Sequence, residues 1–183
     1  MNKFDNFPID IDKFRGLPIN SHPGAFGCAR KFNFHEGIDL YGSPGDGVFA
    51  IRDGVVVANM PFTGPKTGYG WWLDTDAILV KDDTGYYVYG ELKSDLKVGD
   101  NVEANQKIGQ LVPVLEDYKT RNDIPGHSVT MLHLERYSLD YDIYGGWSSW
   151  DKRENRPKYL IDPTLDLINI LTNLGLRVNF LPL

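Results

Sequence analysis

The chain has 183 residues, a length that suits one domain with a sizeable core. Its 19 glycines, 11 prolines and 10 tyrosines favour many short strands joined by turns over long helices. The formal net charge is −6 and lysine and arginine do not cluster, which argues against nucleic acid as a partner.

The single cysteine, Cys28, excludes an intrachain disulfide and a zinc site built from cysteines. The first residues carry no apolar segment typical of a signal peptide, and no apolar run is long enough to span a membrane. We therefore expect either a cytoplasmic chain or an exported one whose leader has been removed, and the compartment stays open.

The predicted elements follow one another in a simple order. Residues 1–33 are interrupted by proline and glycine, so we expect an N-terminal wrap over part of a sheet. Short segments of strand-forming residues, bounded by turn residues, then predict strands at 37–41, 48–52, 54–59, 77–81, 86–92, 96–102, 107–114 and 129–135. Asp162 and Pro163 predict the start of a C-terminal helix, and Gly175 its end.

Two aromatic-rich loops separate these elements. Residues 60–76 contain Trp71 and Trp72, and residues 136–162 contain Trp147 and Trp150. Such side chains either line a binding cleft or cover the core, and the sequence favours neither.

A short pattern occurs twice. Gly45-Asp46-x-Val48-x-Ala50 returns as Gly99-Asp100-x-Val102-x-Ala104, and each copy precedes a glycine and an apolar strand. Two related hairpin units around one core would explain the repeat, although a match this short also arises by chance.

The chemistry centres on His35 and Asp39. If 35–39 is extended, the two side chains share a face, and an imidazole with a carboxylate supplies two of the three protein ligands of a catalytic-type zinc site. His133, in the alternating segment 131–135, is the best candidate for the third. A lone histidine is more often an ordinary core or surface residue, so the prediction depends on the combination.

At these residues the chain resembles the lysostaphin-like (LytM-type) zinc metalloendopeptidases, the family with the duplicated hybrid motif. His35-Glu36-Gly37-Ile38-Asp39 is similar to the family's H-x-x-x-D motif, and Leu132-His133-Leu134 is similar to the end of its H-x-H motif. Val98–Val102 and Lys107–Gly109 are similar to the hairpin between them, and 24–30 to the segment before the first motif. The likeness covers roughly residues 22–136 in matching order.

The resemblance implies an all-β fold, a mainly antiparallel β-sandwich or barrel-sandwich hybrid with a C-terminal helix. It also implies one domain over 1–183, with a wrap (1–33), a core (34–135) and an aromatic loop plus helix (136–183). Carried over, the zinc ligands are His35, Asp39 and His133, and the substrate is a peptide, typically in bacterial peptidoglycan.

Two departures from the family pattern affect catalysis. The family's Tyr-Gly-His-Leu strand is Tyr-Gly-Glu91-Leu here, and the first histidine of H-x-H is Met131, so both assisting histidines are replaced. Glu91 could serve as the general base, ligate the metal or be an ordinary strand residue. His127 is the other candidate catalytic residue, although a surface histidine is the commoner case.

Four nearby side chains are weaker candidates for a role in the predicted zinc site. Tyr87 and Tyr89 share a face with Glu91 in a regular strand and could donate to an oxyanion, although most strand tyrosines are packing residues. Glu36 should point away from His35, and Glu135 should share the face of His133 and orient a ligand.

Two functions remain open. One is a zinc metallohydrolase that cuts a peptide bond, with Glu91 in place of the missing histidine. The other is a non-catalytic zinc-binding relative that binds a peptide or glycan or regulates another protein.

Overall fold

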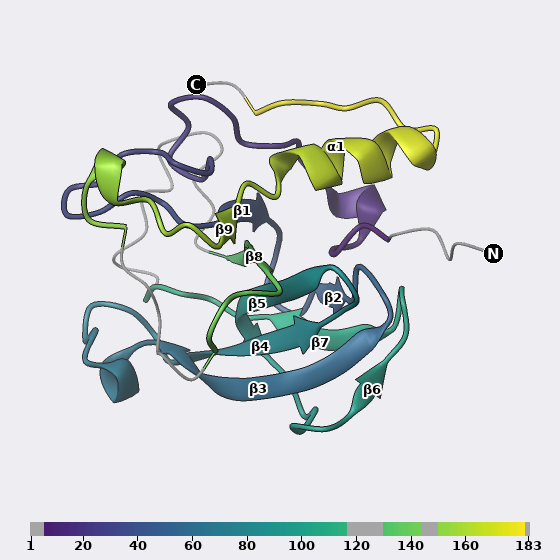
Figure 1. Ribbon diagram of the computed structural model, residues 1–183, viewed down its shortest axis with the longest axis horizontal. Helices are drawn as coiled ribbons and strands as arrows, with labels where there is room; N and C mark the ends of the chain where they lie inside the picture. The colour runs from purple at the N-terminus through teal and green to yellow at the C-terminus, as the bar shows by residue number, and fades with distance from the viewer. Residues whose placement is uncertain (1–5, 117–129, 144–149, 182–183) are drawn as a thin grey trace.

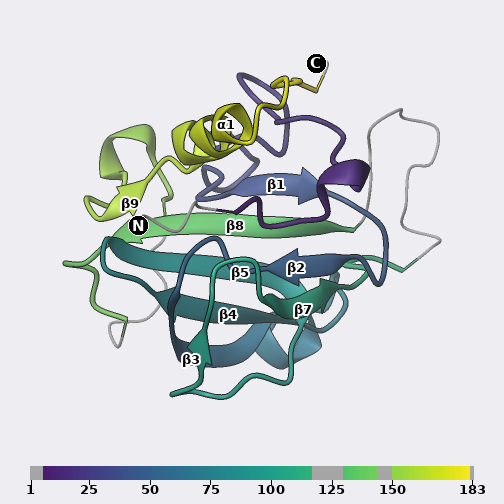
Figure 2. The same cartoon turned by 90° about the vertical axis from the view of Figure 1, so that its right-hand side faces the viewer.

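The computed structural model describes residues 6–116, 130–143 and 150–181. Its main feature is an antiparallel sheet with the strand order β1-β8-β5-β4-β3-β6, to which β2, β7 and β9 are attached (Figures 1 and 2). The strands are β1 (Ile38–Tyr41), β2 (Gly47–Phe49), β3 (Gly54–Thr63), β4 (Thr75–Lys81), β5 (Gly85–Lys93), β6 (Asn101–Val102), β7 (Lys107–Leu111), β8 (Met131–Ser138) and β9 (Leu160–Ile161). In the described ranges, single turns of 3₁₀ helix are η1 (Ile11–Lys13) before β1, η2 (Pro65–Thr67) between β3 and β4, and η4 (Arg153–Asn155) between β8 and β9.

The predicted fold class is confirmed: the named strands pair antiparallel and one helix, α1 (Thr164–Asn173), follows them. Several predicted strand boundaries are wrong. β2 and β7 each end three residues earlier than expected, at Phe49 and Leu111, and β8 continues to Ser138, three residues beyond the expected end. β3 continues through Thr63 into the expected loop, and only the last two residues of 96–102 form a strand. The earlier part of that segment is a turn instead, in which the Asp100 carboxylate accepts a hydrogen bond from the Lys97 N–H (2.8 Å).

The central sheet has two different faces. The larger apolar cluster covers one face and includes Tyr87 and Tyr89 of β5 and Leu132 and Leu134 of β8. The N-terminal segment adds Phe7, Ile9 and Leu17 to this cluster. A smaller cluster around Val88 and Tyr137 lies on the other face, so the alternation of β5 and β8 separates the two.

Helix α1 packs against the larger cluster and lies above β1 and β8 in Figure 2. Its buried side chains are Leu167, Ile170 and Leu171, whereas Leu165 and Leu174 are exposed. The Asp162 carboxylate accepts a hydrogen bond from the Thr164 N–H (2.9 Å), which satisfies one of the free amides at the helix start. No helix in the described ranges has the length and apolar character that crossing a membrane would need.

The two copies of the repeated pattern occupy equivalent structural positions. The N–H of Gly45 donates to the carbonyl of Leu111, whose own N–H donates to the carbonyl of Asp46. In the second copy, the N–H of Gly99 donates to the carbonyl of Val56, whose own N–H donates to the carbonyl of Asp100. Each copy thus pairs with the strand that follows the other, and this reciprocal pairing supports a true internal repeat.

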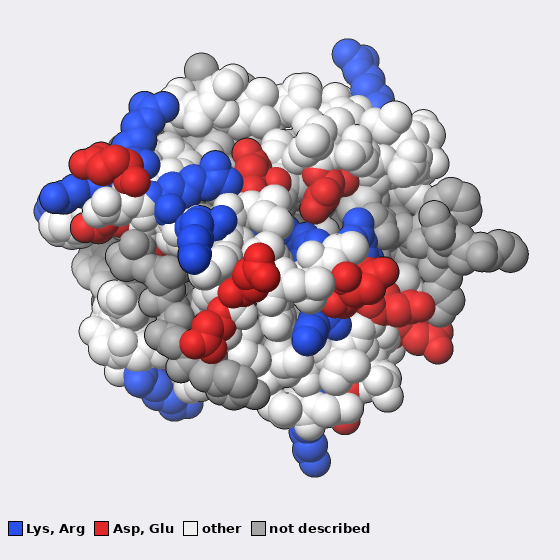
Figure 3. All heavy atoms as spheres, viewed as in Figure 1, with Lys and Arg blue, Asp and Glu red and all other residues white. Residues whose placement is uncertain are grey.

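Lysine and arginine side chains alternate with acidic ones on the face seen in Figure 3. Among the described residues, this face therefore presents no basic patch of the kind that binds nucleic acid.

Substitutions of Leu167 and Leu165 test directly which face of α1 packs against the larger cluster. Leu167→Ala should lower the free energy of unfolding by about 2–5 kcal/mol because it leaves a cavity at a fully buried position. Leu165→Ala should change it by less than about 0.5 kcal/mol, since that side chain is 64% exposed. Urea denaturation measures both, and equal losses would contradict this placement of the helix.

Candidate metal centre

The pairing of β1 with β8 brings Asp39 and His133 together. They lie directly opposite each other in the register, so their side chains leave the sheet on the same face. His35 comes from the segment just before β1, held by backbone hydrogen bonds to Gly27 (2.8 Å) and Cys28 (2.9 Å). The extended geometry expected at 35–39 therefore begins only at Ile38, yet His35 still reaches Asp39.

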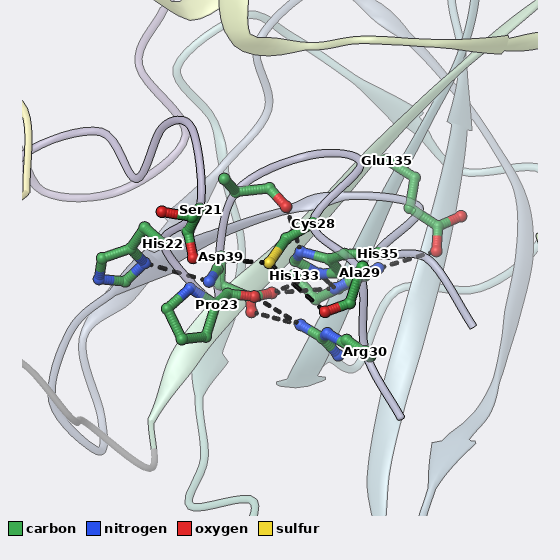
Figure 4. Close-up of polar contacts among 12 residues, drawn as sticks. Ser21, His22, Pro23, Cys28, Ala29, Arg30, His35, Asp39, His133 and Glu135 are labelled. Atoms are coloured by element: carbon green, nitrogen blue, oxygen red, sulfur yellow. Dashed lines mark hydrogen bonds and ion pairs between the residues drawn. The ribbon is translucent and has the colours of Figure 1, made fainter. Parts of the chain in front are cut away.

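Three side-chain atoms form a nearly equilateral triangle (Figure 4). The Nε2 atom of His35 lies 3.0 Å from Oδ1 of Asp39 and 3.1 Å from Nδ1 of His133, and that Nδ1 lies 3.0 Å from the same Oδ1. Ligands bound tetrahedrally to zinc at about 2.0–2.1 Å lie about 3.3 Å apart. The donor set and spacing fit a divalent metal ion.

Each corner of the triangle is oriented by a second contact. His35 Nδ1 donates to the carbonyl of Ala25 (3.0 Å), His133 Nε2 donates to Oε1 of Glu135 (2.8 Å), and Arg30 donates to Oδ2 of Asp39 (3.0 Å). These bonds leave His35 Nε2 and His133 Nδ1 with their lone pairs toward the common centre. Such carbonyl and carboxylate partners fix the ring orientation in protein metal sites.

Gly37 makes room for this arrangement. A Cβ atom there would lie 2.8 Å from ring atoms of His133 and 2.7 Å from the carbonyl oxygen of Leu134. Both distances are shorter than normal van der Waals contact, so any larger residue would displace the imidazole.

The centre stabilises positive charge at His133. Burial lowers the pKa of that imidazole, but the hydrogen bonds and charges of Asp39 and Glu135 outweigh burial and raise the pKa to about 10. Burial also opposes ionisation of Asp39, yet the two histidines hold its pKa well below the usual range. The pKa of His35 is lowered, chiefly by burial. A cation at Nδ1 of His133 is therefore favoured, and a metal ion bound there would displace a proton.

Glu91 reaches the same centre through a β-bulge. Gly90 of β5 lies opposite His133, so in a regular strand Glu91 would point to the other face, with Tyr89. The register shifts in this part of the β4–β5 pairing, and Glu91 has a φ of +64°, a conformation that non-glycine residues rarely adopt. This local backbone geometry lets the carboxylate line the cleft with His35 and His133.

The negative charge of the Glu91 carboxylate is poorly stabilised by its surroundings. Its Oε2 is buried and has no hydrogen-bond partner among the described residues. Burial, and next the charge of Asp39, raise its pKa to about 8. An unpaired carboxylate beside a metal-type triad is unusual enough to indicate a function.

The two tyrosines proposed as oxyanion donors are in the wrong place. The Tyr87 hydroxyl donates to Asp166 (3.0 Å), and the Tyr89 hydroxyl accepts a hydrogen bond from the Ile51 N–H (2.9 Å) on the core face. The expectation that they share a face with Glu91 fails because it assumed a regular strand. Met131 lies opposite Tyr41 in the β1–β8 register and supplies no titratable group.

The side chain of Glu36 also differs from expectation. It lines the cleft instead of pointing away, because 35–37 precede the regular part of β1. Its Oε1 accepts a hydrogen bond from the backbone N–H of Trp150. Burial and the nearby charge of Glu135 raise its pKa to about 7.

The cleft over the centre has a volume of about 390 Å³ and is partly aromatic. Tyr69 and Trp72 of the 60–76 loop line it, and Phe62 stacks near the His133 ring at 5.3 Å between centroids. Trp150, by contrast, is buried and stacks on Phe34, so it covers the core. Trp147 and the candidate catalytic residue His127 lie outside the described residues.

Residue-level reasoning did not identify several contacts of the site. The Arg30–Asp39 pair, the Ala25 carbonyl and the cleft-facing Glu36 all come from segments without regular periodicity. Only the resemblance pointed to the segment that contains Arg30, and nothing in that segment's alternation predicted its partner.

Comparison with solved structures shows a shared fold. The catalytic domain of the antimicrobial peptidase lysostaphin from Staphylococcus simulans is 21% identical, with 85% of this chain and 91% of that chain covered and a TM-score of 0.50. A solution structure of lysostaphin is 20% identical over 93% of this chain and 56% of that one, with a TM-score of 0.52.

Comparisons at the level of sequence give a family. None of the curated protein sequences compared with the chain matches it. The model of peptidase family M23, however, matches residues 33–139, more than half of the 183 residues, and this range contains His35, Asp39 and His133. The chain therefore belongs to peptidase family M23.

Proposed function

We propose that this chain is a zinc metallopeptidase that hydrolyses a peptide bond, in bacterial peptidoglycan or a peptide derived from it. The observation that carries the proposal is the triangle of His35, Asp39 and His133, whose converging donor atoms are each oriented by a second contact. Membership of a peptidase family supports the reaction class.

His35, Asp39 and His133 would hold the zinc ion, and three protein ligands suit a catalytic site better than a closed structural one. When bound, zinc supplies a Lewis acid that lowers the pKa of water to about 7. Arg30 keeps the second oxygen of Asp39 occupied, so the carboxylate presents one oxygen to the centre.

Glu91 takes the role of general base in this proposal. Its buried Oε2, which has no partner in the part of the chain that the structure describes, can accept a proton from the attacking water and return it to the leaving amine. A carboxylate serves as the base in the H-E-x-x-H zinc peptidases, so the replacement is chemically sound. His127 is the second candidate for proton transfer.

The replacement of the assisting histidine by Met131 favours a second candidate function. Without that imidazole, the chain would bind a peptide or glycan in the cleft, or regulate another protein, and zinc would be structural. Turnover by the wild-type protein separates the two candidates.

Metal content is the first prediction. Protein purified without chelators should contain about one zinc ion per chain, and His133→Ala should contain little, because the remaining two ligands hold zinc weakly. Elemental analysis covering the other divalent metals gives the amount and the identity.

His127→Ala is the matched control and should retain the metal. Chelator treatment should lower the melting temperature of the wild type and leave that of His133→Ala nearly unchanged. Wild-type protein that contains no metal and gains none on dialysis against zinc would contradict the proposed centre.

Glu91→Gln tests the catalytic role. The substitution keeps the shape of the side chain but removes the base, so the release of amino groups from purified peptidoglycan should fall about 100-fold or more. The zinc content should stay that of the wild type.

Two results would contradict the role of Glu91. Retention of full activity would show that another group moves the proton, and His127→Ala would then be the informative variant. Loss of zinc together with activity would show that Glu91 is a ligand. A fully zinc-loaded wild type that hydrolyses neither peptidoglycan nor peptides would support the binding module.

A further inference from the structure

Three glutamates line one cleft. Glu36 precedes β1, Glu91 occupies the bulge of β5 and Glu135 lies on β8, and all three border the space that contains His133. Carboxylates gathered in a partly buried cleft repel one another unless a positive charge is present.

Glu36 and Glu135 form an acidic site separate from the metal-type triangle. The His133 ring lies between the two places, with Nδ1 toward Asp39 and Nε2 toward Glu135, as the close-up in Figure 4 shows. The carboxylate of Glu135 therefore lies on the side of the His133 ring that faces away from the metal-type triangle. Glu36 is close enough to Glu135 for their charges to oppose each other.

The hydrogen bonds of these two carboxylates do not occupy all of their acceptor oxygens. Glu135 is only 3% exposed, and its Oε1 accepts a hydrogen bond from His133. Its Oε2 is buried, and no described residue forms a hydrogen bond with it. Glu36 uses Oε1 for a backbone amide. Within the described ranges, neither residue forms an ion pair with a lysine or arginine. A buried carboxylate oxygen without a donor indicates a missing cationic or donor group.

A divalent metal ion at the triangle would not balance the charge. Asp39 and the three glutamates bring four negative charges when ionised, whereas Arg30 and the metal ion bring three positive ones. One negative charge remains, and the three glutamates that contribute to it line the cleft. The cleft is thus complementary to a group with a single positive charge.

The walls of the cleft suit an organic cation. Phe62 lies against the His133 ring, and Tyr69 and Trp72 stand at the rim, with Tyr69 61% exposed. Aromatic faces attract ammonium groups and pack against the methylene chain that carries them.

We propose that Glu36 and Glu135 bind a primary ammonium group of the peptide substrate, so that the enzyme selects peptides with a free amine beside the bond that is cut. This inference rests on the proposed peptidase function and specifies its substrate class. The ammonium belongs either to a lysine-type side chain or to the N-terminus of the peptide.

Binding of synthetic peptides tests the inference without relying on hydrolysis. Isothermal titration calorimetry on metal-loaded wild-type protein, with mass spectrometry of the recovered peptide to confirm that it stays intact, compares acetyl-Gly-Gly-Lys-Gly-Gly-amide with its Nε-acetyllysine twin. A second pair, Gly-Gly-norleucine-Gly-Gly-amide with a free or an acetylated N-terminus, tests the chain-end amine. The free amine of one pair should bind about tenfold more tightly than its blocked twin, and the pair that shows the difference identifies the source.

Single substitutions locate the effect. Glu36→Gln and Glu135→Gln should reduce the preference to within about twofold, and Glu103→Gln, an exposed glutamate in the β6–β7 turn, should leave it unchanged. The wild-type preference should also weaken at high salt. Each variant is first checked for a wild-type circular dichroism spectrum and zinc content, because an unfolded or metal-free variant would also lose the preference.

The outcomes separate this inference from the proposed function. Equal binding of free and blocked peptides in both pairs would overturn the inference, even if the wild type hydrolyses peptidoglycan. A clear amine preference in a protein that hydrolyses nothing would support the acidic site and overturn the peptidase proposal alone.

Discussion

The pairing of Asp39 with His133 across β1 and β8 is the constraint on which the site depends. In an antiparallel sheet, directly opposite residues project from the same face, so this one register places a carboxylate and an imidazole within 3.0 Å. A slip of β8 by one residue would turn His133 toward the apolar cluster that contains Leu134 and separate it from Asp39. The packing of α1 and the N-terminal segment on that cluster therefore also holds the metal-type triangle in place.

The bulge at Glu91 shows how a strand next to this constraint is adapted for chemistry. A non-glycine residue at φ +64° costs of order 1–3 kcal/mol, and the buried carboxylate adds a desolvation cost. The fold tolerates both because β5 is held on each side, by β4 and by β8. A cost of this kind persists where the resulting geometry is used, which is why Glu91 is a stronger catalytic candidate than a tyrosine on the regular part of the strand.

Regular alternation explains what could be predicted. The strands, the meeting of Asp39 with His133 and the closeness of Glu135 to His133 follow from a period of two combined with the motif resemblance. His35 precedes β1, so its place beside them agrees with the motif resemblance alone. The predictions that failed concern residues at which the strand alternation is interrupted. Glu36 precedes the strand, and Tyr87 and Tyr89 are separated from Glu91 by the bulge. Trp150 contacts Glu36, which is distant in the sequence, and Arg30 reaches Asp39 from an irregular segment, and no local pattern encodes either contact.

The resemblance implies that Glu91 and Met131 stand in place of two assisting histidines, and such a replacement would change the electrostatics of the site as well as its proton chemistry. An imidazole at position 91 or 131 can carry a positive charge, whereas Glu91 adds a negative one and Met131 adds none. The cleft therefore combines a metal-type centre with more carboxylate than that centre can balance. Because this excess meets an opening lined by aromatic rings, the same substitutions that remove the usual catalytic groups also make the cleft complementary to a cationic ligand. A change in mechanism and a change in substrate preference would then have one structural origin.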